Sequence, residues 1–362
     1  MVNGTTRYHE KHNLSIHYTQ WLQIRTERGC NVSRRLYYCS SRQTIQVYTL
    51  DSLSNVRFKA QVANKWVVGR TMVAGDAAHN FPPFGGQGIA SGFRDSLALV
   101  WRLSLITQHP EIDYEELLTG WYIERKQQVE VCKNISHSQL MLALASTVFN
   151  GGLVCQRSWF WSAVRNALVR SLSMIPPIKK KLEMGPRGIM MRYKFLPHSC
   201  FLDDREGGVF IPQIHIWQGR EHRFSDDVIF EKGKKGIFQL VVLVDTAPEA
   251  RFYEREIEGA DLDSLSGGLI CSAETTYIIH KDRSLDNLPD NFVLAMSQKE
   301  YDEMGYTPPL REYDKERIKK EFRWKKFLVV RPDRYTFGTA IAADGVQDIA
   351  RRAKQMILEK KK

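Results

Sequence analysis

The sequence lacks the cysteine patterns that would point to a metal site or to dithiol chemistry. None of its cysteines forms a C-x-x-C pair or a spacing typical of metal ligands. Unpaired thiols are typical of a cytoplasmic protein, so we expect a cytoplasmic chain without a metal. The six cysteines are Cys30, Cys39, Cys132, Cys155, Cys200 and Cys271.

Long apolar runs are also missing. The longest apolar stretch, residues 140–155, is interrupted by glycine and is too short to cross a bilayer. The first 30 residues lack the apolar core of a signal peptide. No membrane partner is therefore expected.

Basic residues are numerous but dispersed. The net charge is +11, yet no basic segment carries the interleaved aromatic residues of a nucleic-acid-binding module. We therefore expect solvated basic faces and no nucleic-acid partner. With 43% apolar and 26% charged residues over 362 positions, the chain is globular and long enough for two domains.

The most informative stretch runs from residue 71 to residue 106. A short apolar strand, Thr71–Ala74, leads into a Gly75–Asp76 corner, and a proline- and glycine-rich loop follows. An apolar periodicity then predicts a helix from Ile89 to about Ile106. Glycines at the start of a helix allow a ligand to approach unpaired amides at its positive end. The stretch is therefore suited to an anionic or electron-rich group, and Asp76 could accept hydrogen bonds from a polyol.

Two consecutive helices are expected here. The first has apolar residues on one side, namely Leu97, Val100, Trp101 and Leu103. The second, residues 113–131, has one apolar face formed by Leu117, Leu118, Trp121 and Tyr122.

The string from Gly75-Asp76-Ala77-Ala78-His79 through Pro82-Pro83 to Gly86-Gln87-Gly88 resembles a known motif. It is similar to the second FAD-contacting motif of the class A flavoprotein monooxygenases, the single-component aromatic hydroxylases. The resemblance implies an α/β fold: the C-terminal part of a FAD/NAD(P)-binding, glutathione-reductase-like Rossmann domain, followed by a thioredoxin-like α/β domain. It also implies FAD as cofactor, NAD(P)H as co-substrate, and a phenolic or polyketide-type aromatic substrate.

The resemblance assigns cofactor-binding roles within the motif. Asp76 would bind the ribityl chain of FAD, and Pro83 would lie over the flavin edge. The backbone of Gly86, Gln87 and Gly88, with the helix start at Ile89, would face the pyrimidine end of the isoalloxazine. The sequence departs from the family at residue 90, where an alanine stands in place of the asparagine that is common in relatives.

His79 is a candidate general base, but we favour an orienting role in which it hydrogen-bonds the loop. Arg94 and Asp95 are expected to form a structural pair on the helix. No catalytic residue is assigned beyond the weak candidate His79.

The chain also lacks a G-x-G-x-x-G fingerprint after a strand, which opens full-length members of this family. Residues 1–45 are therefore left unassigned, as a truncated or aberrant N-terminus. Residues 46–178 are expected to form the C-terminal part of the FAD domain. Two functions stay open: an active monooxygenase, or a remnant without tight FAD binding that acts as an inactive or partner-binding protein.

Residues 185–362 are predicted to form the thioredoxin-like domain, after a linker at Pro176-Pro177. In relatives this domain provides packing and dimer contacts, so a homodimer is an open alternative. Its predicted elements are a central strand at 238–245, further strands at 276–280 and 327–335, and a closing helix at 344–358.

Several polar residues receive structural interpretations. The segment 122–125 resembles a Y-x-x-E-R segment of the family, and we predict a helix with a surface pair of Glu124 and Arg125. The segment 330–333 resembles the family's V-R-P-D. The histidines expected to stand alone, at the surface or in the core, are His198, His215, His222 and His280.

Overall fold

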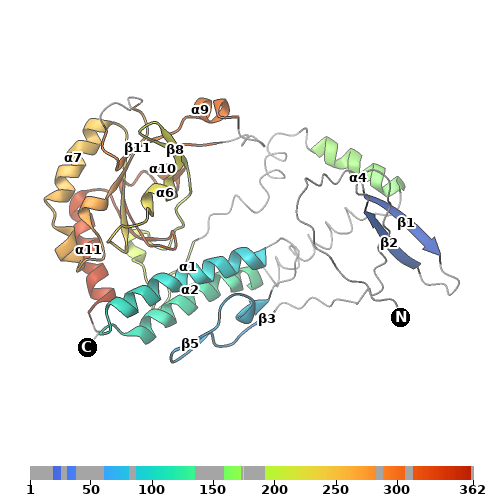
Figure 1. The fold of residues 1–362 in the computed structure, drawn as a ribbon, viewed down its shortest axis with the longest axis horizontal. Coiled ribbons are helices and arrows are strands. Elements are labelled where there is room, and N and C mark those ends of the chain that lie inside the picture. Colours follow the sequence, from blue (N-terminus) through green and yellow to red (C-terminus); the bar gives the residue numbers. More distant parts are fainter. Residues whose placement is uncertain are drawn as a thin grey trace, which may run out of the picture. The chain divides into compact units, whose positions relative to one another are not determined.

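The computed structural model describes residues 19–25, 31–37, 61–80, 87–134, 159–172, 174, 192–282, 288–305 and 313–359 (Figure 1). The chain divides into two compact units, Met1–Phe58 and Lys59–Lys362. In the first unit, β1 (Thr19–Arg25) pairs in an antiparallel manner with β2 (Asn31–Tyr37). The linker at residues 176–181 and most of the helical stretch predicted at 140–168 lie outside the described residues, and α4 covers Trp159–Leu172.

The motif region begins the second unit with short strands and two long helices. β3 (Gln61–Val62) pairs with β6 (His79–Asn80), and β4 (Val67–Val68) pairs with β5 (Thr71–Met72). The predicted strand Thr71–Ala74 therefore ends two residues early, before a 3-10 turn, η1 (Gly75–Ala77). The helices α1 (Gln87–Gln108) and α2 (Tyr114–Asn134) follow and pack against each other (Figure 1).

The packed face of α1 differs from the one that its apolar periodicity predicted. Trp101 is buried and Leu103 is half-buried, but Leu97 and Val100 are 51% and 61% exposed. The reason is that two charged side chains, Asp95 and Arg102, occupy buried positions on α1. For α2 the prediction is confirmed, since Leu117, Leu118 and Trp121 are all buried.

A seven-stranded sheet dominates the rest of the second unit, in the order β13-β12-β9-β10-β11-β7-β8. The strands β9, β10 and β11 are parallel, and the other pairs are antiparallel. This arrangement confirms the α/β class. The strands are β7 (His215–Gln218), β8 (Glu221–Phe224), β9 (Gln239–Val244), β10 (Thr276–Ile279), β11 (Phe292–Ala295), β12 (Phe327–Val330) and β13 (Thr336–Ala340).

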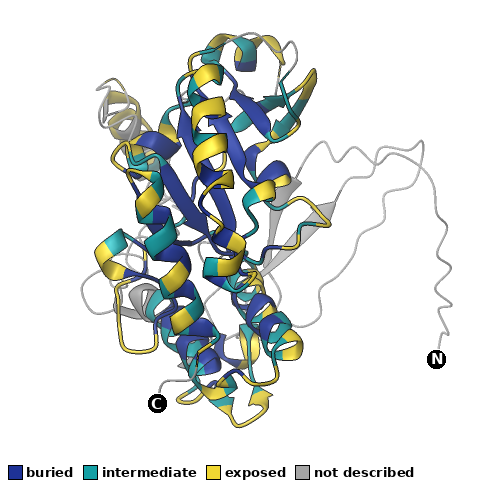
Figure 2. Cartoon of the chain, turned by 90° about the vertical axis from the view of Figure 1, so that its left-hand side faces the viewer, coloured by how far each residue is buried: buried dark blue, intermediate teal, exposed yellow. Residues whose placement is uncertain are grey.

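Helices cover both faces of this sheet, as Figure 2 shows by the buried strands between more exposed helices. Apolar residues of α7 (Ala247–Glu258), α8 (Leu262–Ser266) and α11 (Ala343–Ile357) join one core, and those of α6 (Ser225–Ile229) and α10 (Arg317–Glu321) join the other. All six residues of β9 are buried, and the five apolar ones, from Leu240 to Val244, alternate between the two cores. The predicted central strand and closing helix are thus confirmed. The remaining short elements are α9 (Gln298–Glu303), η3 (Asp203–Arg205) and η4 (Ser272–Glu274).

Along the chain, the sheet begins with the hairpin β7-β8, continues with β9, α7, α8, β10 and β11, and ends with the hairpin β12-β13 and α11. The division of the chain near residue 180 and the thioredoxin-like assignment stay predictions. One strand prediction was wrong: the strand expected at 327–335 ends at Val330. Pro332 has no N–H for a ladder, and Arg334, with φ of 70°, turns the chain back into β13.

Candidate functional site

Two glycines bring the Gly-Asp corner against α1. Gly75 has a left-handed backbone with φ of 58°, which favours glycine. A Cβ added at Gly92 of α1 would lie 3.6 Å from the Cα of Gly75, and the reciprocal distance is 3.8 Å. The corner and the second turn of the helix therefore meet backbone to backbone.

Asp95 of α1 is the hydrogen-bonding centre of this corner. Its Oδ2 accepts hydrogen bonds from the Gly75 amide at 3.0 Å and from Nε2 of His79 at 2.6 Å. Its Oδ1 accepts a bond from Nε of Arg125 in α2 at 2.7 Å. Burial alone would raise the pKa of Asp95, but the His79 hydrogen bond and the Arg125 charge outweigh it and lower that pKa. The prediction that Asp95 pairs with Arg94 is therefore corrected, because the Asp95 side chain is completely buried and turned toward these other partners.

His79 lies inside the corner. Only 1% of it is exposed, and its ring centroid lies 5.3 Å from that of Trp66. The bond to Asp95 fixes the orientation of the imidazole, as an orienting residue requires. The role of His79 stays a prediction.

The predicted cofactor-binding residues are partly described. Asp76 lies exposed in η1. Gly88 lies in the first turn of α1, where an added Cβ would meet nothing within 4 Å, and Ile89 is 78% exposed. Pro83, Gly86 and the side chain of Gln87 lie outside the described residues. An exposed carboxylate and an open helix start, held to the same corner, fit a ligand with a polyol chain and an electron-rich end.

Sequence reasoning missed a second buried charge cluster behind this corner. Glu124 of α2 accepts a hydrogen bond from Arg102 at 2.8 Å, and two from Arg331 at 2.8 and 2.9 Å. Arg331 also donates to Asp333 at 2.7 and 3.0 Å. The prediction of a surface pair at Glu124 and Arg125 was wrong, since both side chains are buried and bind different partners.

This cluster joins four segments of the chain. Trp101 of α1 donates from Nε1 to Asp333 at 3.2 Å. The Cys200 amide donates to Glu124 at 2.7 Å, and the Cys200 carbonyl accepts from Arg331 at 2.8 Å. The two segments that resembled the family, 122–125 and 330–333, thus come together in one buried network. That shared resemblance was the signal that could have suggested a contact.

The isolated-histidine prediction also needs a correction. His215 of β7 and His222 of β8 share a hydrogen bond of 2.8 Å between Nδ1 and Nε2. The hairpin places residues 215 and 222 on neighbouring strands, which sequence distance alone did not reveal. His280 is buried, as a core residue.

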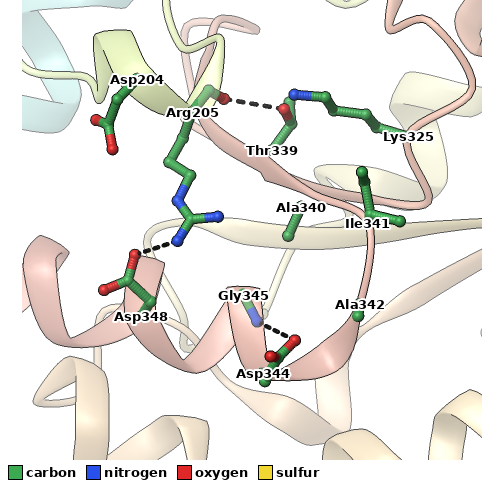
Figure 3. Close-up of a pocket in the computed structure, with 10 residues that line it drawn as sticks. All are labelled: Asp204, Arg205, Lys325, Thr339, Ala340, Ile341, Ala342, Asp344, Gly345 and Asp348. Atoms are coloured by element: carbon green, nitrogen blue, oxygen red, sulfur yellow. Dashed lines mark hydrogen bonds and ion pairs between the residues drawn. The ribbon is translucent and has the colours of Figure 1, made fainter.

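A hollow of about 430 Å³ lies at the start of α11 (Figure 3). Arg205 points across it to Asp348 and forms an ion pair of 2.7 Å. None of the predicted cofactor-binding residues lines it.

Two kinds of feature are missing from the described part of the chain. No group of three or more histidine, cysteine or acidic residues there could hold a metal ion. No helix among those residues has the length and apolar character needed to cross a membrane.

Comparison with protein families gives an independent assignment of the corner. Residues 13–129 match the model of the FAD binding domain family. The match covers the whole of the Gly-Asp corner, α1 and most of α2. It begins within the segment that sequence reasoning left unassigned.

The curated proteins to which the chain is similar include two hydroxylases. The chain is 31% identical over 180 residues to a 3-(3-hydroxy-phenyl)propionate/3-hydroxycinnamic acid hydroxylase of Klebsiella pneumoniae subsp. pneumoniae, covering 47% of this chain and 29% of the relative. It is 33% identical over 210 residues to a probable NADH-specific resorcinol 4-hydroxylase of Rhodococcus jostii, covering 54% of this chain and 37% of the relative. The chain thus spans only about a third of the length of these two relatives.

Among solved structures, the chain is similar to the flavin-dependent monooxygenase PieE in complex with FAD and substrate. The TM-score is 0.46 at 17% identity, over 83% of this chain and 50% of PieE.

Proposed function

We propose that the chain is a FAD-dependent monooxygenase of the class A aromatic hydroxylase type. It would use NAD(P)H and O2 to hydroxylate a phenolic or polyketide-type aromatic substrate. The observation that carries the proposal is the corner itself: a left-handed Gly75 bonded to the buried Asp95, with Asp76 exposed beside it.

The residues of the corner suit distinct tasks. The carboxylate of Asp76 would accept hydrogen bonds from the ribityl hydroxyls. The first amides of α1, around Gly88, would face the pyrimidine end of the flavin, where a helix N-terminus favours negative charge. Asp95 and His79 would keep the corner in place without touching the cofactor. When bound, FAD supplies the activation of oxygen, which these side chains cannot provide.

The names of the relatives support the substrate class. They describe hydroxylases of hydroxyphenylpropionate, hydroxycinnamate and resorcinol, which are all small phenols. One of them is named as NADH-specific, which supports a nicotinamide co-substrate.

The test begins with the purified full chain, incubated with FAD and then dialysed. We expect a retained flavin absorbance band and oxidation of NADH or NADPH that increases with resorcinol or 3-(3-hydroxyphenyl)propionate. The variant Asp76→Ala should retain less FAD. A folded, colourless protein would overturn the proposal and favour the alternative of a remnant without tight FAD binding.

A further inference from the structure

We propose that Asp95 and Arg125 are positioning residues that hold the Gly75–Asp76 corner and the start of α1, the two cofactor-binding elements, in place relative to each other. We further propose that the region with the seven-stranded sheet, which begins at residue 192 and is called the C-terminal sheet region, holds Arg125 in place. The inference rests on the proposed function for its link to FAD. It is carried by a continuous chain of buried contacts, from the Gly-Asp corner through α1 and α2 to residues beyond 192.

The two carboxylate oxygens of Asp95 bind different partners. Oδ2 serves the corner, through the Gly75 amide and His79, while Oδ1 serves Arg125. Losing the partners of either oxygen would be costly, because a buried carboxylate is stable only when its charge is paired and its oxygens accept hydrogen bonds. The backbone of the corner is therefore tied to α2 through a single carboxylate.

The side chain of Arg125 is only 1% exposed, and its guanidinium contacts α1 as well as Asp95. Its Nη2 lies 3.3 Å from the hydroxyl and 3.4 Å from the carbonyl oxygen of Ser91, in the early part of α1. Arg125 thus contacts the start of α1 directly and the Gly75 corner through Asp95. Arg125 therefore reinforces the placement of Asp76 relative to Gly88, in addition to the direct contact of Gly75 with Gly92.

Arg125 is also connected to the C-terminal sheet region by hydrogen bonds. Nη1 of Arg125 donates to the hydroxyl of Tyr193 at 3.3 Å, and to the side chain of Gln128, which in turn bonds Tyr335. The rings of Tyr193 and Tyr335 lie 4.2 Å apart between centroids. Tyr335 directly precedes β13, so the sheet region contacts Arg125 through nitrogen Nη1, while Asp95 binds Nε. This gives the C-terminal region a role in the cofactor site.

Three conservative variants test the proposal. Asp95→Asn keeps the shape, but its one carbonyl oxygen cannot serve the corner and Arg125 at once. Arg125→Lys keeps the charge but loses the fork that reaches Asp95, Ser91 and Tyr193 together. Tyr193→Phe removes the direct hydrogen bond of Arg125 to the sheet region and leaves the link through Gln128 and Tyr335.

The control variant is Asp113→Ala, which removes the N-cap of α2. Asp113 accepts hydrogen bonds from the amides of Glu115 and Glu116 at the start of α2, at 3.1 and 3.2 Å. This substitution perturbs the same helix without touching the corner. It reports what a general loosening of α2 does.

Two measurements are made on the full chain. The first is amide hydrogen exchange at Gly75 and residues 76–80 without FAD, and the second is the Kd for FAD from flavin fluorescence. We expect exchange at Gly75 to rise at least about tenfold in Asp95→Asn and Arg125→Lys, since hydrogen bonds to charged groups are being lost. The FAD Kd should rise in Asp95→Asn and Arg125→Lys, rise less in Tyr193→Phe, and stay unchanged in Asp113→Ala.

The two readouts separate this proposal from the proposed function. If the wild-type chain takes up no FAD but exchange at Gly75 rises in the variants, the monooxygenase assignment fails and the positioning role stands. Unchanged exchange at Gly75 in both Asp95→Asn and Arg125→Lys would overturn the positioning role. A rise in exchange equal to that of Asp113→Ala would also overturn it, since the rise would then reflect general loosening of α2. Should Asp95→Asn not fold, Arg125→Lys and Tyr193→Phe decide the outcome in the same way.

Discussion

The carboxylate of Glu124 accepts hydrogen bonds from both terminal nitrogens of Arg331, which lies 207 positions later in the chain. Both side chains are completely buried. With Arg102 and Asp333 they form a set of two cations and two anions. Charges in such a place are tolerated only as a complete set, because each desolvated ion relies on its partners.

Replacing Arg331 should therefore destabilise the protein strongly. Arg331→Met keeps much of the side-chain volume but leaves Glu124 and Asp333 short of positive charge. We expect a loss of about 3–5 kcal/mol in the free energy of unfolding, measured by urea denaturation. The matched control is Arg352→Met, which breaks the surface pair of Arg352 with Asp204 (2.7 Å). The control should lose less than about 1 kcal/mol, and equal losses in the two variants would contradict the prediction.

Glu124 should make stability depend on pH in the acidic range. Burial would raise its pKa, but the charges of Arg331 and Arg102 outweigh burial and lower the pKa to about 2, from 4.5. A carboxyl with a lowered folded-state pKa stabilises the fold fully above 4.5, and this contribution is lost as pH falls toward 2. Glu124→Gln should therefore show a flatter stability curve between pH 4.5 and 2, in denaturation midpoints measured at fixed ionic strength. Parallel curves for variant and wild type would refute this.

Elements with strong local signals could be predicted from the sequence. The central strand predicted at 238–245 became β9, buried on both faces, and the closing helix predicted at 344–358 became α11, with Val346, Ile349, Ala353 and Ile357 buried on its inner face. The Gly-Asp corner and the two long helices were also located correctly, within a few residues. Each of these signals comes from residues close together in the chain.

The buried polar contacts could not be predicted in the same way. Charged residues are almost never fully buried unless they are paired, so Glu124 and Arg125 were placed on the surface. Their partners, Arg331 and Asp95, lie 207 and 30 positions away, and sequence spacing carries no information about such contacts. The buried face of α1 was predicted wrongly for the same reason, because the partners that bury Asp95 could not be seen in the sequence. Asp95 is as buried as any apolar residue of that helix.

His280 should also destabilise the fold in acid. Burial, together with Lys319 and Lys315, lowers its pKa to about 3, from 6.5, so the folded protein keeps it neutral. The unfolded chain takes up a proton below pH 6.5, and stability falls from there toward pH 3 by up to about 1.4 kcal/mol per pH unit. His280→Phe should remove this slope. The control is His198→Asn, which changes an exposed histidine whose φ of 71° suits asparagine. A loss of slope in this control equal to that of His280→Phe would contradict the prediction.

Gly120 should be intolerant of a methyl group although it lies in the interior of α2. Glycine to alanine normally stabilises a helix interior by about 1 kcal/mol. Here an added Cβ would lie 2.3 Å from the backbone carbonyl oxygen of His198, which cannot move aside as a flexible side chain would. We expect Gly120→Ala to lose about 1–3 kcal/mol in thermal or urea denaturation. A gain in stability would contradict the prediction, since it would mean that the backbone of His198 leaves room for a methyl group at residue 120 of α2.

Gly88 offers the opposite case at the start of α1. An added Cβ there meets nothing within 4 Å, so Gly88→Ala should leave the free energy of unfolding unchanged or raise it slightly. The affinity for FAD should nevertheless fall, because the methyl group would occupy the space through which a ligand reaches the helix amides. The measurement is the FAD Kd from flavin fluorescence, beside a denaturation curve of the same sample. A stable variant with weakened FAD binding would place the cofactor against the helix start. An unchanged Kd would exclude the helix start as a contact and leave Asp76 as the predicted anchor.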